Sequence, residues 1–279
     1  MSDGDLFLGY IPKNFNDDGK TTCLMVGAMV VAELFFTVLV IVTAPKGVKD
    51  RLYYSSCILC IPKVMAMFYF AWHGTAASFG TLEGRTFGGR EFNTEFFCTI
   101  YIAHSIFGIL NEATKDGMNL HTLPMFIHHM ASIVSFGVAM HTGHFIVYTA
   151  YCGLCEITNI PLSIMYLSKT KGGGVAAWME KNFGILLSVN GGMLWLTFFV
   201  FRVIMFPYIL FTLFKDYYTI SQNDPRYSEV WATELYYHPC TIMFLWVISM
   251  MWFQKIHAGF MKVLTGESTA ANAAPEKAE

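Results

Sequence analysis

Residues 22–44 read TCLMVGAMVVAELFFTVLVIVTA, and the single charged side chain in this run is that of Glu33. About 20 predominantly apolar residues are enough for a helix to cross the hydrocarbon core of a bilayer, which is roughly 30 Å thick. We therefore predict a transmembrane helix over this stretch.

Further apolar runs of similar length follow along the rest of the chain, and the run at 94–110 is the shortest of them. The loops between the runs are short and carry glycine, proline and charge. We expect an all-α polytopic membrane protein with about seven transmembrane helices. The six runs that follow residues 22–44 cover 54–79, 94–110, 122–141, 144–167, 184–210 and 238–256.

Composition supports the same class of protein. The 279 residues are 54% hydrophobic and 14% charged, whereas soluble domains contain about 25% charged residues. The net charge of −2 gives no support to a nucleic-acid partner. We divide the chain into a polar N-terminus (1–21), a transmembrane domain (22–265) and a disordered tail (266–279) rich in Ala, Glu and Lys. The distribution of Lys and Arg favours a non-cytoplasmic N-terminus.

Ionisable side chains inside a membrane are costly, and they usually face the interior of a helix bundle. Counting 1.5 Å per residue from the helix ends places Glu33 and Lys63 at similar depth on consecutive helices. We predict that they form an ion pair, either as part of a functional site or as a contact that only fixes helix packing.

A second polar group shares a shallower level, on the half of the membrane that we assign to the cytoplasm. The spacing of 148, 152, 156, 159 and 163 forms one polar stripe on an otherwise apolar helix. This convergence predicts a polar intramembrane cavity within the bundle, although scattered polar residues could also satisfy each other without one. The predicted lining residues are His104, Ser132, Ser135, Tyr148, Cys152, Glu156, Asn159, Asn190 and Arg202.

Two adjacent histidines, His128 and His129, lie on the helix predicted at 122–141. Consecutive helical residues point about 100° apart, so the two rings cannot face one spot equally. The spacing does not say which of them faces the cavity.

The side chain of Arg202 lies nearer the opposite membrane face. Its depth differs from that of Glu156 by about 10 Å on the same count, so we expect no direct pair between them. Arg202 would instead anchor a lipid phosphate or extend to the interface.

Cysteine and histidine spacing predicts no metal site. Two C-x-x-C pairs, at 57–60 and 152–155, lie within apolar runs. A structural zinc site needs four ligands, and neither pair has further ligands nearby in the sequence, so we interpret these cysteines as small packed thiols. The H-x-x-H at 141–144 lies at a loop and is interpreted as interfacial.

Several segments resemble one known family. Residues 126–132 (FIHHMAS) look like a double-histidine helix, and residues 151–162 (YCGLCEITNIPL) are similar to the segment that follows it. The Asn-Gly at 190–191, the FFVFR at 198–202 and the WFQKI at 252–256 continue the match in order. Together they resemble the TLC-domain (TRAM/LAG/CLN homology) family of multi-pass membrane proteins, over roughly residues 50–265.

The same family includes ceramide synthases, in which the histidine pair is followed one helix later by His-Asp and a further Asp. The corresponding residues here, 144–154 (HFIVYTAYCGL), lack those acids. The chain is more similar to the small TLC-domain-containing branch, whose members bear on membrane phospholipid composition. The resemblance implies lipid metabolism or homeostasis, and an endoplasmic reticulum location rather than the plasma membrane.

Two functions remain open. The first is lipid binding that regulates membrane lipid composition or homeostasis, with a headgroup or sterol in the cavity. The second is acyl transfer to a membrane lipid, with acyl-CoA as co-substrate and no resident cofactor. In that case His128 would be the general base, oriented by Ser132 or Glu156, and His129 or Asn190 would stabilise the oxyanion.

Other membrane-protein classes have less support. A retinal receptor needs a lysine deep in its last helix, and residues 244–252 contain none. A di-iron hydroxylase needs several histidine boxes, and the chain has one adjacent pair. A channel or transporter would be supported only by possible helix breaks at Pro62 and Pro161, and proline is common in membrane helices.

Overall fold

The computed structural model describes residues 19–115, 123–230 and 232–265. Within these ranges the regular structure is entirely helical, which confirms the all-α prediction. The disorder predicted for 266–279 and most of the predicted polar N-terminus lie outside the described residues.

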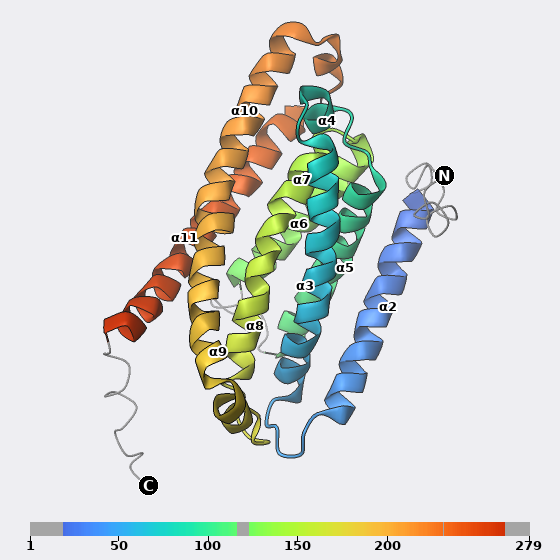
Figure 1. Ribbon diagram of the computed structural model, residues 1–279. Helices are drawn as coiled ribbons and strands as arrows, with labels where there is room; N and C mark the ends of the chain where they lie inside the picture. Colours follow the sequence, from blue (N-terminus) through green and yellow to red (C-terminus); the bar gives the residue numbers. More distant parts are fainter. Residues whose placement is uncertain (1–18, 116–122, 231, 266–279) are drawn as a thin grey trace, which may run out of the picture.

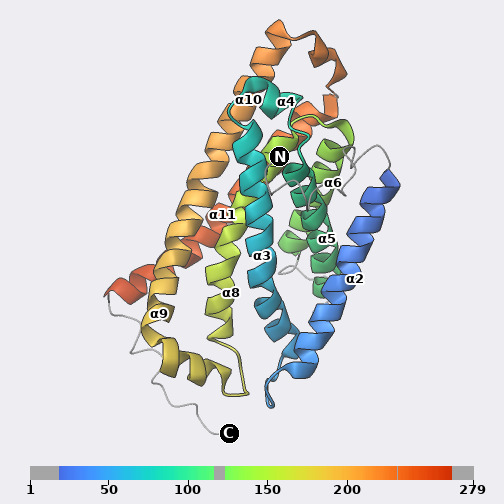
Figure 2. The ribbon, with the colours of Figure 1, turned by 45° about the vertical axis from the view of Figure 1, so that its right-hand side comes forward.

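The long helices lie side by side in one elongated bundle, and α11 crosses it obliquely (Figures 1 and 2). The elements in chain order are α2 (Gly19–Thr43), α3 (Arg51–Ser78), α4 (Leu82–Thr86), α5 (Phe92–Lys115), α6 (Leu123–Thr142), α7 (Ile146–Gly153), η1 (Leu154–Thr158), α8 (Asn159–Leu167), α9 (Val175–Phe198), η2 (Phe199–Ile204), α10 (Met205–Asn223), η3 (Pro225–Glu229) and α11 (Ala232–Thr265).

Among the described residues, five helical segments are long and apolar enough to cross a membrane. These segments are Thr22–Thr43, Arg51–Ser78, Leu123–Thr142, Val175–Asn223 and Glu234–Thr265. They establish an integral membrane protein and correspond to five of the seven predicted spans.

The other two predicted spans form helical structure with a weaker membrane signal. The run at 94–110 lies in α5, which carries Glu95 and His104 among its apolar residues. The run at 144–167 is divided by η1 into the short helices α7 and α8. Both segments are nevertheless part of the bundle (Figures 1 and 2).

Turns at one end of the bundle connect four of its helices. The carboxylate of Asp50 accepts a hydrogen bond of 2.8 Å from the backbone N–H of Tyr53 and so caps α3. The nearby backbone N–H of Lys49 donates to the carbonyl of Lys171 at 3.1 Å, which ties the α2–α3 turn to the α8–α9 turn. Gly172 has φ +80, and a Cβ there would lie 2.1 Å from the carbonyl oxygen of Gly47.

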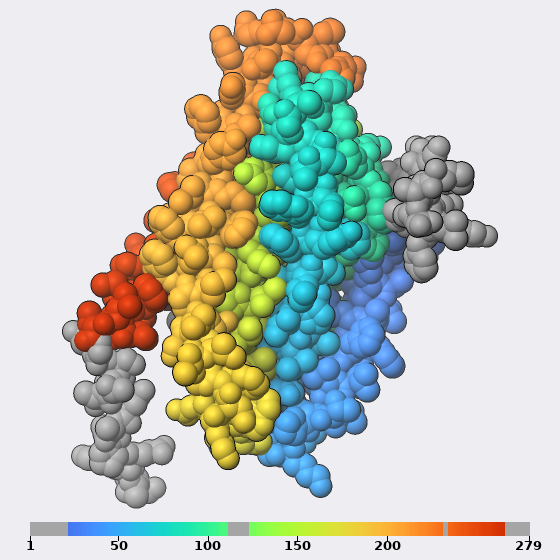
Figure 3. Space-filling view, viewed as in Figure 1, coloured from blue at the N-terminus to red at the C-terminus, as the bar shows by residue number. Residues whose placement is uncertain are grey.

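The bundle has a well-packed interior and a peripheral helix. Phe97, Phe145 and Phe206 are among its largest fully buried side chains. The helix α8 is recessed between α3 and the α9–α10 rod (Figure 3). In contrast, α2 packs mainly against α3 and α5 within the described ranges, and it stands at the edge of the bundle (Figure 2).

Two helical irregularities face each other inside this bundle. η1 is a 3₁₀ segment between α7 and α8, and η2 is a π-helical segment between α9 and α10. The two segments are in contact. Irregular turns of this kind within long helices often mark functional sites or hinges, and these two carry Glu156 and Arg202.

Candidate functional site

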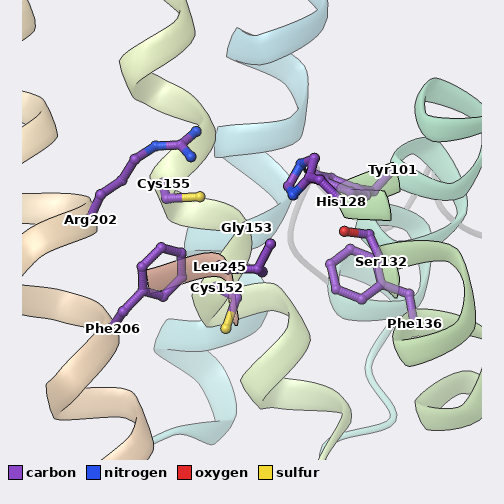
Figure 4. Close-up of a pocket in the computed structure, with 10 residues that line it drawn as sticks. All are labelled: Tyr101, His128, Ser132, Phe136, Cys152, Gly153, Cys155, Arg202, Phe206 and Leu245. Carbon is purple, nitrogen blue, oxygen red and sulfur yellow. Dashed lines mark hydrogen bonds between the residues drawn. The ribbon is translucent and has the colours of Figure 1, made fainter. Parts of the chain in front are cut away.

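A small cavity lies inside the bundle where α5, α6, α7, η1, η2, α10 and α11 meet (Figure 4). Its volume is about 20 Å³. A space of that size holds about one water molecule, so in this conformation it fits a single polar atom and not a lipid headgroup. The lining residues are Tyr101, His128, Ser132, Phe136, Cys152, Gly153, Cys155, Arg202, Phe206 and Leu245.

Two buried side chains that line the cavity, Tyr101 and His128, form a hydrogen-bonded chain with the buried Glu156. The hydroxyl of Tyr101 donates to Oε1 of Glu156 at 3.2 Å. The same hydroxyl lies 3.4 Å from Nε2 of His128. Because a phenol has one proton, its oxygen then accepts from the Nε2–H of His128. This assignment follows from the hydrogen-bond pattern, and it leaves Nδ1 of His128 as an acceptor.

The carboxylate of Glu156 is the centre of this network. Nδ2 of Asn159 donates to its Oε2 at 2.6 Å, and the thiol of Cys155 lies 3.7 Å from its Oε1. Nη2 of Arg202 lies 3.9 Å from Oε1. A buried carboxylate requires such compensation, because an unpaired charge in this interior would be very costly.

The side chain of Arg202 points into the bundle (Figure 4) and is 7% exposed. Its Nε donates to Oγ1 of Thr158 at 3.0 Å. Its guanidinium carbon lies 5.2 Å from the ring centroid of Phe198, a cation–π distance. The guanidinium is therefore held from two sides while it lines the cavity.

The expectation that Arg202 and Glu156 are too far apart to pair is wrong. Counting residues compares the depths of Cα atoms, whereas a guanidinium lies at the end of a long side chain. In addition, the rise of a 3₁₀ segment such as η1 is about 2.0 Å per residue, so an α-helical count misplaces Glu156. In the structure Arg202 does not extend to the interface.

The structure separates the two adjacent histidines. His128 lines the cavity, whereas His129 faces α5. A Cβ on Gly108 would lie 2.7 Å from Nε2 of His129, and the rings of His104 and His129 are 5.9 Å apart. Nδ1 of each of these two rings is buried without a hydrogen-bond partner among the described residues.

Four residues predicted to form the site line the cavity, namely His128, Ser132, Cys152 and Arg202. Glu156 and Asn159 are not lining residues of the cavity, but the hydrogen bonds described above connect them to Tyr101, which is one.

The remaining predicted lining residues make contacts elsewhere. Oγ of Ser135 lies 3.0 Å from Nδ1 of His238. The hydroxyl of Tyr148 donates to Asp216 at 2.6 Å, and Nδ2 of Asn190 donates to the carbonyl of Pro161 at 2.8 Å.

Sequence reasoning missed Tyr101, Cys155 and Phe206 as residues of the cavity. Tyr101 could have been found, since it lies three residues before His104 and so on nearly the same helix face. Cys155 belongs to a C-x-x-C pair that the sequence argument assigned to packing. Phe206 is apolar and carries no signal in a search for polar residues.

The predicted partners Glu33 and Lys63 are in contact, with Nζ of Lys63 2.5 Å from Oε1 of Glu33. This pair connects α2 to α3 and lies outside the cavity. In the described ranges no group of three or more His, Cys, Asp and Glu side chains is placed to hold a metal ion.

Comparison with known proteins identifies the family. The family model of the TLC domain matches residues 49–258, a range that contains every residue lining the cavity and excludes α2. Comparisons with curated proteins and with solved structures gave no significant match. Because the matched range covers most of the chain, this protein belongs to the TLC-domain family of membrane proteins.

Proposed function

We propose that this protein binds membrane lipids and regulates membrane lipid composition, with the polar part of a lipid held at the cavity around His128 and Arg202. One observation carries the proposal. A buried guanidinium lines a cavity inside the membrane-spanning bundle.

The donor capacity of Arg202 favours a ligand. A guanidinium has five N–H donors, and one hydrogen bond from it, to Thr158, is found among the described residues. Its pair with Glu156 is long, at 3.9 Å. An acceptor oxygen in the cavity would complete its hydrogen bonding. Ionisable groups kept at this depth in membrane proteins usually serve binding or transport.

The size of the cavity limits what the closed form can hold. About 20 Å³ accommodates one oxygen, such as an acyl carbonyl. Binding of a whole headgroup would require the surrounding helices to move apart.

Acyl transfer is the second candidate, and the His128–Tyr101–Glu156 chain favours it. A general base needs a partner that orients its ring, and Tyr101 does so through Nε2 of His128. Nδ1 would then take the proton from a lipid hydroxyl or amine as that group attacks the thioester carbonyl of acyl-CoA. The C–S bond breaks, and the departing CoA thiolate takes up the proton that His128 returns. An endoplasmic reticulum location would suit either function.

The test is lipid profiling of cells that express the wild type, His128→Ala or His129→Ala at matched levels. The His129 variant is the positional control, because it carries the same change on the neighbouring residue that faces α5. We expect the wild type and His129→Ala to change one lipid class and His128→Ala not to change it. Equal profiles for all three proteins and the empty vector would refute a role in lipid composition.

Binding and catalysis are separated with purified protein. Retention of a radiolabelled lipid by His128→Ala, together with loss of the cellular effect, would favour acyl transfer. Loss of retention in Arg202→Gln would favour binding at the cavity.

A further inference from the structure

A second hollow lies between α10 and α11. Its volume is about 230 Å³, and every lining residue is apolar or aromatic. Phe211 and Phe214 at its edge are 69% and 52% exposed, so the hollow opens to the surface that faces lipid. The lining residues of this groove are Phe206, Pro207, Leu210, Phe211, Phe214, Ile242 and Trp246.

One side chain, that of Phe206, is shared by the walls of this groove and of the cavity. It is almost completely buried. On α11 the consecutive residues Leu245 and Trp246 line the cavity and the groove respectively. Phe206 lies next to Arg202 at the cavity (Figure 4). The groove is open to lipid, and it ends at the ring of Phe206. The guanidinium of Arg202 lies in the cavity that this ring also lines.

We propose that the groove binds the acyl chain of a membrane phospholipid, and that Phe206 is the gate through which the ester carbonyl oxygen of that chain reaches Arg202. This inference rests on the proposed function and names its ligand: an acyl ester, recognised by one carbonyl oxygen.

The dimensions of the two spaces fit the two parts of such a ligand. The groove is smaller than the roughly 300–1,000 Å³ of pockets that enclose whole small molecules, so it holds part of a chain. The cavity holds one oxygen atom and excludes a phosphate group. In a phospholipid the apolar chain leads to an ester whose carbonyl oxygen is a strong acceptor, so the chain would lie in the groove and this oxygen in the cavity. The glycerol and headgroup, attached through the other ester oxygen, would remain outside the cavity.

The indole of Trp246 gives a second, independent indication. It lines the groove, and its Nε1 is buried without a hydrogen-bond partner in the described part of the chain. Buried tryptophan N–H groups usually have a partner. The second oxygen of an ester is an acceptor of the kind that is missing here.

The test uses the full chain in liposomes of diether phosphatidylcholine, a host lipid without ester carbonyls. Two phosphatidylcholine probes carry a photoactivatable diazirine in one chain, which is ester-linked in the first and ether-linked in the second. After irradiation, mass spectrometry measures labelling of 206–214 and 242–246 relative to the exposed surface of α2. We expect the ester probe to label the groove about tenfold more than the ether probe, the range of a hydrogen bond to a charged donor.

Three variants test the roles of Arg202 and of the groove separately. Arg202→Gln removes the charged donor, so it should abolish the preference for the ester probe. Ile242→Trp fills the groove and should abolish labelling there, whereas Met251→Trp, on an exposed part of the same helix, should leave it unchanged. Ile242 is itself buried in the core, so the comparison of the ester and ether probes in the wild type, which needs no substitution, tests the inference even if Ile242→Trp does not fold.

Equal labelling by the two probes in the wild type would overturn the inference, as would full labelling of Ile242→Trp. Each result can be distinguished from failure of the proposed function. If the ester probe is preferred but cellular lipids show no His128-dependent change, the inference about the groove stands and the proposed function is refuted. If cellular lipids show a His128-dependent change but the ester probe is not preferred, the proposed function stands and the inference about the groove is refuted.

Discussion

The Nη2 atom of Arg202 lies 3.9 Å from Oε1 of Glu156, although the two residues are on different rods of the bundle, in η2 and η1. Each residue lies in the irregular turn of its rod. The pair therefore joins two places where the regular α-helix is interrupted, at the wall of the polar cavity.

Breaking this pair should destabilise the bundle. Removing one partner of a buried ion pair leaves an uncompensated charge and costs about 3–5 kcal/mol. We expect Glu156→Gln to lower the free energy of unfolding by this amount, measured by thermal denaturation in lipid nanodiscs. The exposed Glu180 provides the control, since Glu180→Gln should change stability by less than about 0.5 kcal/mol. Equal stability of the two variants would contradict the pairing.

Gly153 must remain without a side chain, because it packs against Phe97. A Cβ at this position would lie 2.0 Å from the ring of Phe97. We expect Gly153→Ala to destabilise the protein by about 1–3 kcal/mol, the usual cost of overpacking. Its matched control is Gly137→Ala on α6, where a Cβ has no neighbour within 4 Å; this change should be neutral or stabilising by up to about 1 kcal/mol. Thermal denaturation measures both, and the additional change Phe97→Leu should restore part of the loss.

The attachment of α2 should depend on the ion pair between Glu33 and Lys63. A single Glu33→Gln change leaves the Lys63 ammonium unpaired inside the membrane, at a cost of about 2.5–3.5 kcal/mol. We expect α2 to dissociate when the α2–α3 loop is cleaved and the protein is purified through its C-terminus. The exchanged pair, Glu33→Lys with Lys63→Glu, should retain α2. Equal retention of α2 in the single variant and the wild type would show that apolar packing alone holds this helix.

The contact between η3 and α4 should depend on pH. Hydrogen bonds from Arg226 lower the pKa of the Glu83 carboxyl and of the Asp224 carboxyl. A lowered pKa stabilises the folded contact above the ordinary carboxyl value of about 4, and this stabilisation is lost as the pH falls through the lowered pKa. Glu83 is exposed and Asp224 is partly exposed, so solvent screening keeps the effect local.

The measurement for this contact is hydrogen exchange at residues 226–230, corrected for the intrinsic exchange rate. Protection should be constant from pH 7 to about pH 5 and should fall below about pH 4. In Arg226→Gln protection should be lower and independent of pH across the same range. A wild-type protection that increases on acidification would contradict the assigned sign.

Much of the architecture could be predicted because lipid imposes a simple rule on sequence. Apolar runs of helix length located the membrane segments, and the depth count correctly paired Glu33 with Lys63. The lengths of individual helices were less predictable. The run predicted at 184–210 begins directly after a kink at Phe183 (φ −135, ψ 20), but the helical structure continues well past its predicted end, to Asn223. Apolar composition marks the part of a helix inside the lipid, whereas the helix itself extends as far as packing supports it.

The candidate site was predicted in part. Periodicity placed Cys152 on a polar stripe, and Cys152 lines the cavity. Tyr148 belongs to the same stripe as Cys152, yet its hydroxyl bonds to Asp216. A stripe shows which side chains share a face of one helix, but the partner of each one depends on the neighbouring helix at that level.

By itself, the sequence determined that this protein is an all-α membrane protein of the TLC-domain family, because hydropathy and motif order are properties of the chain alone. Only the tertiary structure decided that His128 rather than His129 faces the cavity, and that Arg202 reaches Glu156. It also showed that Phe206 lines both that cavity and an apolar groove. These relationships depend on helix rotation, on the local geometry of η1 and η2, and on the reach of long side chains. All three are set by packing between segments distant in sequence.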